Sequence, residues 1–414
     1  MGLTPFLQPK VVLFCGVAVM LKLNLSVINR SPRESRRSLV VGAAVVATIA
    51  CATTASASDL TLRVMTQNVY QGTNFDEVLA ATTPLEFAQA VTTTYNNILA
   101  TQPAERAAAV ASEMAREQPD LVGLQEVATL LTGNAPGAPA TTVQFDYLKL
   151  LQADLAARGQ HYSVVATLPE FTAEAPSTLG FDVRVDRGNV LLARDSDNAT
   201  VTNVQADPYV NQLSVPTLAG PVPDLRGLTS VDVSLGGATF RFATTHLATV
   251  QPVQLQQMNE VISSTSGATL PLIVVGDFNA NADDPGDPTF ATYQAAIDAG
   301  FVDAWSEAHG GDPGYTCCQA QNLLNATSSL NQRIDLTLLR GGVSVDDVEL
   351  IGDSDADRTM PSGLWPSDHA GLIATFNIPE RSITVPEAST WVMMVLGFAG
   401  LGLARHFRQS ARIR

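Results

Sequence analysis

A short apolar run that ends in a glycine, an acid and an amide constrains this chain more than any other segment. Pro271 is followed by Leu-Ile-Val-Val and then by Gly276, Asp277, Phe278 and Asn279. The apolar residues predict a buried strand, and Gly276 permits a sharp turn at its end. Side chains two positions apart on an extended backbone share a face, so we expect Asp277 and Asn279 to point together. A carboxylate beside an amide suits a hard cation, a water nucleophile or a phosphoryl oxygen, although a strand end of this kind on its own is more often only a turn.

The N-terminal segment, residues 1–57, has the features of an export signal. Arg36 and Arg37 precede an apolar run over residues 39–52, and the small residues Ala-Ser-Ala follow at 55–57. A basic region, an apolar region and a small-residue site in this order predict a secretory signal peptide cleaved after Ala57. A short membrane anchor is the alternative interpretation.

The C-terminal segment, residues 385–414, has three parts. Pro386-Glu387-Ala388 is followed by an uncharged run over residues 391–404, and four arginines follow that run. A helix of this length spans roughly 21 Å, less than a bilayer core of about 30 Å, and the arginines favour a cytoplasmic end. The tail resembles the PEP-CTERM sorting signal of Gram-negative bacteria. That resemblance implies exosortase-type processing, transient attachment to the inner membrane, and release to the cell surface or the medium. A permanent tail anchor is the alternative.

The central part of the chain, residues 58–380, is expected to form one catalytic domain. The whole chain carries 24 basic and 40 acidic residues, and the two end segments hold ten of the basic residues but only two of the acidic ones, so the residues between the end segments, 58–384, have a formal charge of −24. This charge argues against a protein that tracks a nucleic-acid backbone with a basic stripe. It leaves open a nuclease whose cleft is compensated by metal.

The only cysteines of the central part, Cys317 and Cys318, are adjacent. In an oxidising compartment they can form a strained disulfide, stay free or bridge to another chain. No histidine or base motif accompanies them, so a structural role is favoured over a catalytic one.

The order of predicted elements mixes hairpins with helices. Gly236-Gly237 lies between two alternating runs at 229–235 and 239–246, which predicts a hairpin, while helical spacing appears over 103–117 and at 147–155. Residues 128–142 and 169–182 are expected to be loops. The pattern predicts an α/β (α+β) fold of two mixed, mainly antiparallel β-sheets packed face to face, with helices outside, in a protein expected to be a monomer.

Polar residues recur where the apolar strands of this prediction begin or end. Each has a simple structural explanation when taken alone: a turn residue, a solvated strand end, a buried histidine, or an ion pair between Arg333 and Asp335. The joint pattern favours function. The residues concerned are Asn68, Glu126, His246, Asp277, Asn279, Asp335, Asp368 and His369.

The motifs that contain these residues are Q-N, L-Q-E-V, T-H-L, G-D-F-N, R-I-D and S-D-H, in that order along residues 62–376. In this the chain resembles the endonuclease/exonuclease/phosphatase superfamily, which includes deoxyribonuclease I-like nucleases, inositol-polyphosphate 5-phosphatases and bacterial sphingomyelinases. The resemblance implies a four-layer sandwich. G-D-F-N followed later by S-D-H is the specific part, whereas Q-N alone is weak.

The resemblance implies a metal site and a water-handling group. Glu126 with Asn68 is expected to hold Mg²⁺ or Mn²⁺, with Ca²⁺ as a further candidate, and Asp368 is expected to complete the site. Asp277, helped by Asn279, is expected to orient or deprotonate the attacking water.

Further roles concern the phosphate. His369, oriented by Asp335, is expected to act on the water or the phosphate, and His246 and Asn279 are expected to contact a phosphate oxygen. Arg187 stands where some members place a phosphate-binding basic residue. The active-site tyrosine of the family has no clear counterpart, and Tyr162 is the guess.

The sequence therefore predicts an exported, divalent-metal-dependent phosphodiesterase that activates a water molecule. The substrate is left open among nucleic acid, phospholipid and small phosphodiesters. One alternative is a phospholipase C-type sphingomyelinase or a phosphatase on the same core. Another is a non-catalytic surface or biofilm protein on the same scaffold, suggested by the sorting tail.

Overall fold

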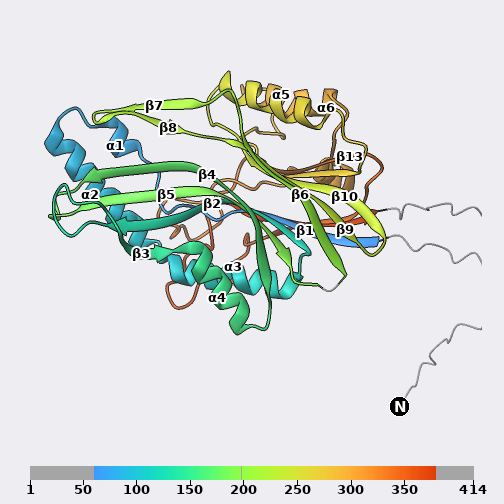
Figure 1. Ribbon diagram of the computed structural model, residues 1–414, viewed down its shortest axis with the longest axis horizontal. Helices are drawn as coiled ribbons and strands as arrows, with labels where there is room; N and C mark the ends of the chain where they lie inside the picture. The colour runs from blue at the N-terminus through green and yellow to red at the C-terminus, as the bar shows by residue number, and fades with distance from the viewer. Residues whose placement is uncertain (1–59, 197, 379–414) are drawn as a thin grey trace, which may run out of the picture. The chain divides into compact units, whose positions relative to one another are not determined.

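The computed structural model describes residues 60–196 and 198–378 of the chain (Figure 1). The predicted signal segment and the predicted sorting tail lie outside these residues. Within the described part, no helix is both long enough and apolar enough to cross a membrane.

The first sheet contains the N-terminal strand and the two longest hairpin strands. Only the β1–β2 pair is parallel, and every other neighbouring pair is antiparallel. The strands lie in the order β14 (Ser344–Ile351), β15 (Gly371–Ile378), β1 (Leu60–Asn68), β2 (Leu121–Thr132), β5 (Asp182–Arg194) and β4 (Tyr162–Pro176), with β3 (Thr142–Asp146) paired to the far end of β2.

The second sheet is built in the same way, with one parallel pair, β10–β11. Gly236 and Gly237 both have positive φ and connect β9 to β10, so the predicted hairpin is confirmed. The order is β12 (Val302–Asp303), β13 (Asp335–Arg340), β11 (Leu272–Asp277), β10 (Ala238–His246), β9 (Gly227–Leu235) and β6 (Ala199–Pro208).

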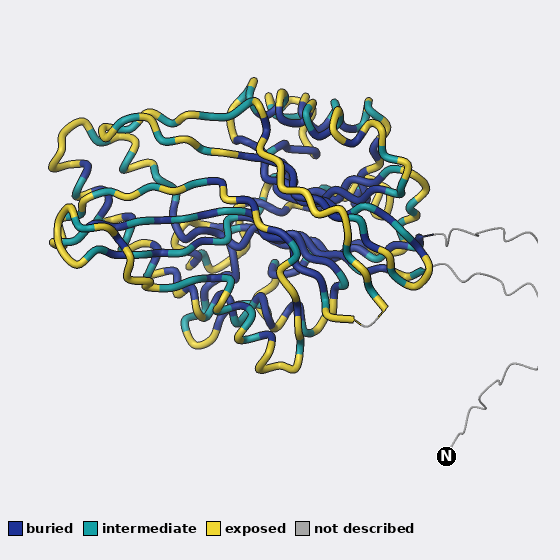
Figure 2. The backbone as a smooth tube through the Cα atoms, in the orientation of Figure 1, coloured by how far each residue is buried: buried dark blue, intermediate teal, exposed yellow. Residues whose placement is uncertain are grey.

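The two sheets share one apolar core. It contains Leu62 and Phe376 from the first sheet and Phe240, Phe242 and Ile273 from the second, and none of these side chains is exposed. Figure 2 shows the buried backbone concentrated where the strands of the two sheets overlap. Because alternate residues of each strand face this core, the opposite faces of the sheets need covers of their own.

Helices supply those covers. The helices α3 (Pro103–Glu117) and α4 (Tyr147–Ala157) pack on the outer face of the first sheet, while α5 (Val253–Thr265) and α6 (Phe290–Asp298) pack on the second. The predicted four-layer sandwich is confirmed. The remaining helices are α1 (Asp76–Ala80), α2 (Pro84–Ala100), α7 (Ala304–His309) and the 3₁₀ turn η1 (Asp355–Asp357).

The predicted loops at 128–142 and 169–182 are wrong in part: residues 133–141 and 177–181 are loop, but the residues on either side belong to strands. Strand β2 continues to Thr132 and β4 continues to Pro176, so β4 and β5 form a long hairpin that extends beyond the shared core. Pro169 is tolerated because β4 is an edge strand, and the register shifts between Pro169 and Phe171. Residues 207–226, a polar and proline-rich stretch whose sequence predicts a surface excursion, contain instead the hairpin of β7 (Leu213–Thr217) and β8 (Gly220–Asp224).

Candidate active site

Strand register brings the predicted residues of the second sheet together. His246 ends β10 directly opposite Asp277 at the end of β11, and Asp277 is in turn opposite Asp335, the first residue of β13. These three residues are up to 89 positions apart in the sequence, but they are neighbours on the adjacent strands β10, β11 and β13. Asn68, at the end of β1, approaches them from the other sheet.

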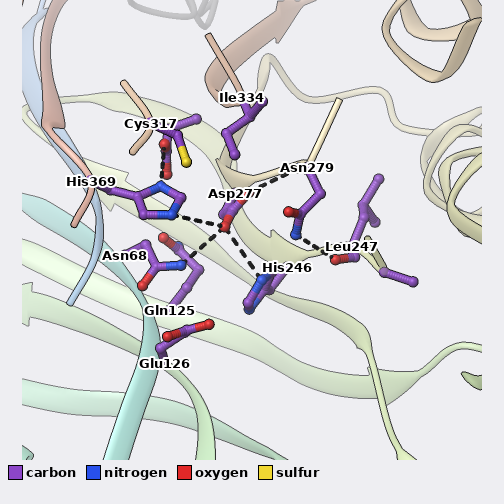
Figure 3. A network of polar contacts seen from close by, with 12 residues as sticks. Asn68, Gln125, Glu126, His246, Leu247, Asp277, Asn279, Cys317, Ile334 and His369 are labelled. Carbon is purple, nitrogen blue, oxygen red and sulfur yellow. Dashed lines mark hydrogen bonds and ion pairs between the residues drawn. The ribbon is translucent and has the colours of Figure 1, made fainter. Parts of the chain in front are cut away.

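Asp277 is the centre of the polar network (Figure 3). Its Oδ2 accepts a hydrogen bond from Asn68 Nδ2 at 3.0 Å and faces His246 Nε2 at 3.3 Å and His369 Nε2 at 3.9 Å. Its Oδ1 accepts from the backbone N–H of Asn279 at 2.8 Å. Burial raises the pKa of Asp277 above its ordinary value. A carboxylate that is both fixed and more basic than usual is suited to accept a proton from water.

His369 and Asp335 form a buried pair. His369 Nδ1 lies 2.8 Å from Asp335 Oδ2, and Arg333 pairs with Asp303 instead of Asp335. Burial opposes a charge on His369, but the carboxylates of Asp335 and Asp368 outweigh it and raise the pKa of His369 well above its ordinary value. His369 is therefore a cation at neutral pH, with Nε2 directed toward Asp277.

His246 has the opposite character. Burial, reinforced by the Arg226 guanidinium, lowers the pKa of His246 to about 3, so its imidazole is neutral at physiological pH. Its Nδ1 lies 3.6 Å from Glu170 Oε2. Two histidines with pKa values moved in opposite directions flank one aspartate, an arrangement that allows them separate roles.

A bulge in the first sheet directs Glu126 into the same region. The β2–β5 register shifts between Leu124 and Val127, and Glu126 has a φ of +58°, a conformation that is uncommon for a residue with a side chain. Its Oε2 accepts from the backbone N–H of Gln71 at 2.9 Å. Burial opposes ionisation of Glu126, but the Arg187 guanidinium and the hydrogen bond from the Gln71 backbone outweigh it, so the net effect lowers its pKa.

The carboxylates of Glu126 and Asp368 fit a hard cation. Burial, together with the charge of Glu126, raises the pKa of Asp368 to about 7. Two partly buried carboxylates that repel one another in this way gain stability from a shared divalent ion, which prefers oxygen ligands. The Oδ1 of Asn68 accepts from the N–H of Tyr70 and its amide nitrogen orients Asp277, and a part for Asn68 in holding the metal stays a prediction.

Arg187 and Asn279 both reach the site but are already engaged. Arg187 bonds Asp224 at 2.6 Å and Gln71 at 3.1 Å, and lies 3.8 Å from Glu126 Oε1. The amide nitrogen of Asn279 donates to the carbonyl of Leu247 at 2.9 Å. Arg187 thus neutralises buried acids, and contact with a phosphate stays a prediction for both residues.

The guess at Tyr162 is wrong. Its hydroxyl donates to the Pro119 carbonyl at 2.9 Å, and its ring packs in the core below α3 and α4, on the outer face of the first sheet. Tyr70 lies nearer: the charges of Asp368 and Glu126 act on its hydroxyl and, after burial, help to raise its pKa. Tyr70 stands two positions after Asn68 of the Q-N motif. This position was the sequence signal that could have identified it as the tyrosine near the site.

Sequence reasoning also missed Glu170. The structure buries it completely, bonded to Asn189 at 2.7 Å and facing His246, Arg187 and Arg226. Glu170 falls inside the stretch predicted as loop, at the irregularity between Pro169 and Phe171. A correct prediction of the long β4–β5 hairpin would have placed it beside the site.

Cys317 and Cys318 are joined in a disulfide beside His369. Cys317 is buried and its backbone bridges Gln332 and His369. The structural role that was favoured for the two cysteines stays a prediction, and His369, which is distant in the sequence, lies beside them.

A model of the Endonuclease/Exonuclease/phosphatase family matches residues 65–369, whereas no curated protein sequence gives a significant match. Among solved structures, humanised D. rerio TDP2 is 18% identical and covers 77% of this chain and 99% of its own, with a TM-score of 0.44. A family protein from Leptotrichia buccalis is 16% identical, covering 76% and 98%, with a TM-score of 0.48. The Bacteroides thetaiotaomicron mannosyl-6-phosphatase Bt3783 is 14% identical, covering 76% and 99%, with a TM-score of 0.46.

Proposed function

Since the chain belongs to the Endonuclease/Exonuclease/phosphatase family, we propose that it is a divalent-metal-dependent phosphoesterase that cleaves a phosphodiester by attack of an activated water. The observation that carries this proposal is the meeting of a fixed carboxylate, Asp277, with a cationic imidazole, His369, at the ends of strands from both sheets. Phosphoester hydrolysis needs these two functions: a group that positions and deprotonates water, and positive charge at the phosphoryl oxygens.

Each residue has a defined task in this mechanism. Asp277 accepts the proton of the attacking water, and Asn68 with the backbone of Asn279 keeps its carboxylate in place. His369, held by Asp335, presents N–H and positive charge to the phosphate or the leaving oxygen. Neutral His246 faces the Asp277 carboxylate with its Nε2 and helps to keep the carboxylate in position.

Glu126 and Asp368 are the residues that would hold Mg²⁺ or Mn²⁺. The bound cation supplies charge stabilisation at the phosphoryl oxygens. Repulsion between these carboxylates, which contributes to the raised pKa of Asp368, supports their assignment as ligands.

Hydrolysis of bis(4-nitrophenyl) phosphate tests the proposal. Purified protein spanning residues 58–385 is assayed with Mg²⁺, Mn²⁺, Ca²⁺ or EDTA, and Asp277→Asn is expected to lower the rate roughly 100- to 10,000-fold. The exposed Asp347→Asn is the matched control. Equal rates for Asp277→Asn and the parent would refute the assignment. Absence of both hydrolysis and Mn²⁺ binding by calorimetry would favour the non-catalytic scaffold.

We also propose that the protein acts outside the cytoplasm. The basic and apolar N-terminal run and the PEP-CTERM-like tail support this, as does a disulfide between the two cysteines of the central part. Mass spectrometry of the protein recovered from the producing cells tests it: a mature chain that starts at Ser58 and ends near Pro386 is expected. Recovery of the full-length chain in the cytoplasmic fraction would contradict the proposal.

A further inference from the structure

An apolar cavity lies beside the candidate active site. It has a volume of about 170 Å³, is partly open to solvent, and lies between α1, α2, the extended parts of β4 and β5, and the β7–β8 hairpin, the elements gathered at one end of the sheets in Figure 1. Side chains from all of these elements line it, among them Phe75, Leu79, Val91, Phe171, Val183 and Val222.

Arg187 separates this cavity from the predicted metal ligands. Its guanidinium carbon lies 5.4 Å from the centre of the Phe171 ring, which stacks on Phe75 at 5.2 Å. On its other side, Arg187 Nη1 lies 3.8 Å from Glu126 Oε1. The cavity therefore begins one side chain away from Glu126, close enough for a group attached to a bound phosphate to enter it.

The polar residues of the cavity do not favour a second phosphate. Glu174 and Asp224 are acidic, and Arg187, the one basic residue that lines it, is already paired with Asp224 at 2.6 Å. A neighbouring phosphodiester of a polynucleotide would find no free basic side chain among the residues that line the cavity. An uncharged apolar group would contact the aromatic and branched aliphatic side chains that line the cavity. It would displace water from these side chains, which favours binding.

We propose that this cavity binds an apolar group of the substrate, so that the enzyme acts on a phosphoester that carries an alkyl, acyl or aryl group beside the phosphate. The inference rests on the proposed function. An apolar cavity of roughly 150 Å³ is large enough for a benzene ring in another protein, so the matching group here is one ring or a short alkyl segment.

Calorimetric titration with a series of alkyl phosphates tests the inference without depending on turnover. Inorganic phosphate, butyl phosphate and hexyl phosphate are titrated in the presence of Mg²⁺. Each added methylene is expected to tighten binding about threefold to fourfold until the cavity is filled. A dissociation constant that does not depend on chain length would overturn the inference.

Two leucine-to-aspartate variants distinguish binding in the cavity from a general effect of surface hydrophobicity on binding. Leu79 is 44% exposed and lines the cavity, and Leu85 is 63% exposed and does not. Leu79→Asp should remove the preference for hexyl phosphate over inorganic phosphate, and Leu79→Met should keep it. Leu85→Asp should behave as the parent. Loss of the preference in both aspartate variants would overturn the inference.

A dinucleoside monophosphate distinguishes a nucleic-acid substrate. If it binds more tightly than hexyl phosphate, and equally in Leu79→Asp and the parent, the cavity is not the substrate site. Hydrolysis of bis(4-nitrophenyl) phosphate in the same preparation reports on the proposed function separately, because that function can hold while the cavity proves irrelevant.

Discussion

His369 Nδ1 bonds Asp335 Oδ2 at 2.8 Å, and this contact joins the loop before β15 to the first residue of β13. Asp335 is completely buried, and its Oδ1 has no hydrogen-bond partner. The pair fixes the ring so that Nε2 faces Asp277 at 3.9 Å. The orientation of the His369 ring therefore depends on Asp335, and its charge depends on Asp335 together with Asp368.

Asp335→Asn is the first prediction. An amide keeps the shape of the side chain but removes the charge that favours the imidazolium, so kcat should fall roughly 100- to 10,000-fold. The Mg²⁺ concentration for half-maximal rate should stay the same, because Asp335 is not among the proposed ligands. Steady-state kinetics over a magnesium series measure both. The exposed Asp347→Asn is the matched control, and a changed magnesium requirement in Asp335→Asn would show that Asp335 takes part in holding the metal.

Glu126→Gln is the second prediction. The neutral amide keeps the hydrogen bond from Gln71 but weakens the attraction for a cation. The Mg²⁺ or Mn²⁺ concentration for half-maximal rate should therefore rise by at least about tenfold. Glu349→Gln, an exposed position on β14, serves as the control. A fall in rate with an unchanged metal requirement would show that Glu126 does not hold the ion.

Arg187→Gln is the third prediction. Arg187 is 7% exposed and lies among Glu126, Glu170 and Asp224. Removing one partner from a buried set of charges costs about 3–5 kcal/mol of folding free energy. Urea unfolding should show this loss, and adding Asp224→Asn should recover part of it. A raised KM with unchanged stability would instead support the phosphate-binding role predicted from the sequence.

The strand ends could be predicted from the sequence because their signals are local. The apolar run before Gly276 and Asp277 predicts both a strand and the position at which it ends. The glycine pair at 236–237 predicts the turn of the hairpin. The grouping of His246 with Asp277 then follows from register across a parallel pair. Local pattern and chain order were sufficient for this part of the site.

The ion pairs could not be predicted in the same way. Arg333 lies two positions from Asp335, yet it pairs with Asp303 because Asp335 is turned toward His369. Arg187 pairs with Asp224 across 37 positions, through a hairpin that the proline-rich sequence did not reveal. The partner of a buried charge depends on how distant segments pack together. A local sequence pattern does not contain that information.

Gly123→Ala is the fourth prediction and tests how closely the sheets approach. A Cβ at Gly123 would lie 2.5 Å from Thr244 Oγ1 and 2.8 Å from Val275 Cγ2, both in the opposite sheet. Overpacking of this kind costs typically about 1–3 kcal/mol, so the urea midpoint should fall. Gly267→Ala, where no atom lies within 4 Å of the added Cβ, should leave the midpoint nearly unchanged. Equal midpoints in the two variants would mean that the sheets separate easily at this point.

Glu113 provides the pH-dependent prediction. This α3 residue is 2% exposed and neither carboxylate oxygen has a hydrogen-bond partner. Burial, with a smaller contribution from Asp357, raises its pKa from 4.5 to about 8. Between these two pH values the unfolded chain releases this proton while the folded chain keeps it. The contribution of Glu113 to folding stability is therefore fully present below pH 4.5 and is lost as pH rises toward 8.

Glu113→Gln removes this titration. The variant should be more stable than the parent at pH 8, by about 1–4 kcal/mol, and the difference should shrink toward pH 5. Urea unfolding at several pH values measures it, with the exposed Glu307→Gln as the matched control. A stability difference that is the same at pH 5 and pH 8 would show that the Glu113 carboxyl finds a partner or water when it ionises, and that its burial imposes no electrostatic cost on the fold.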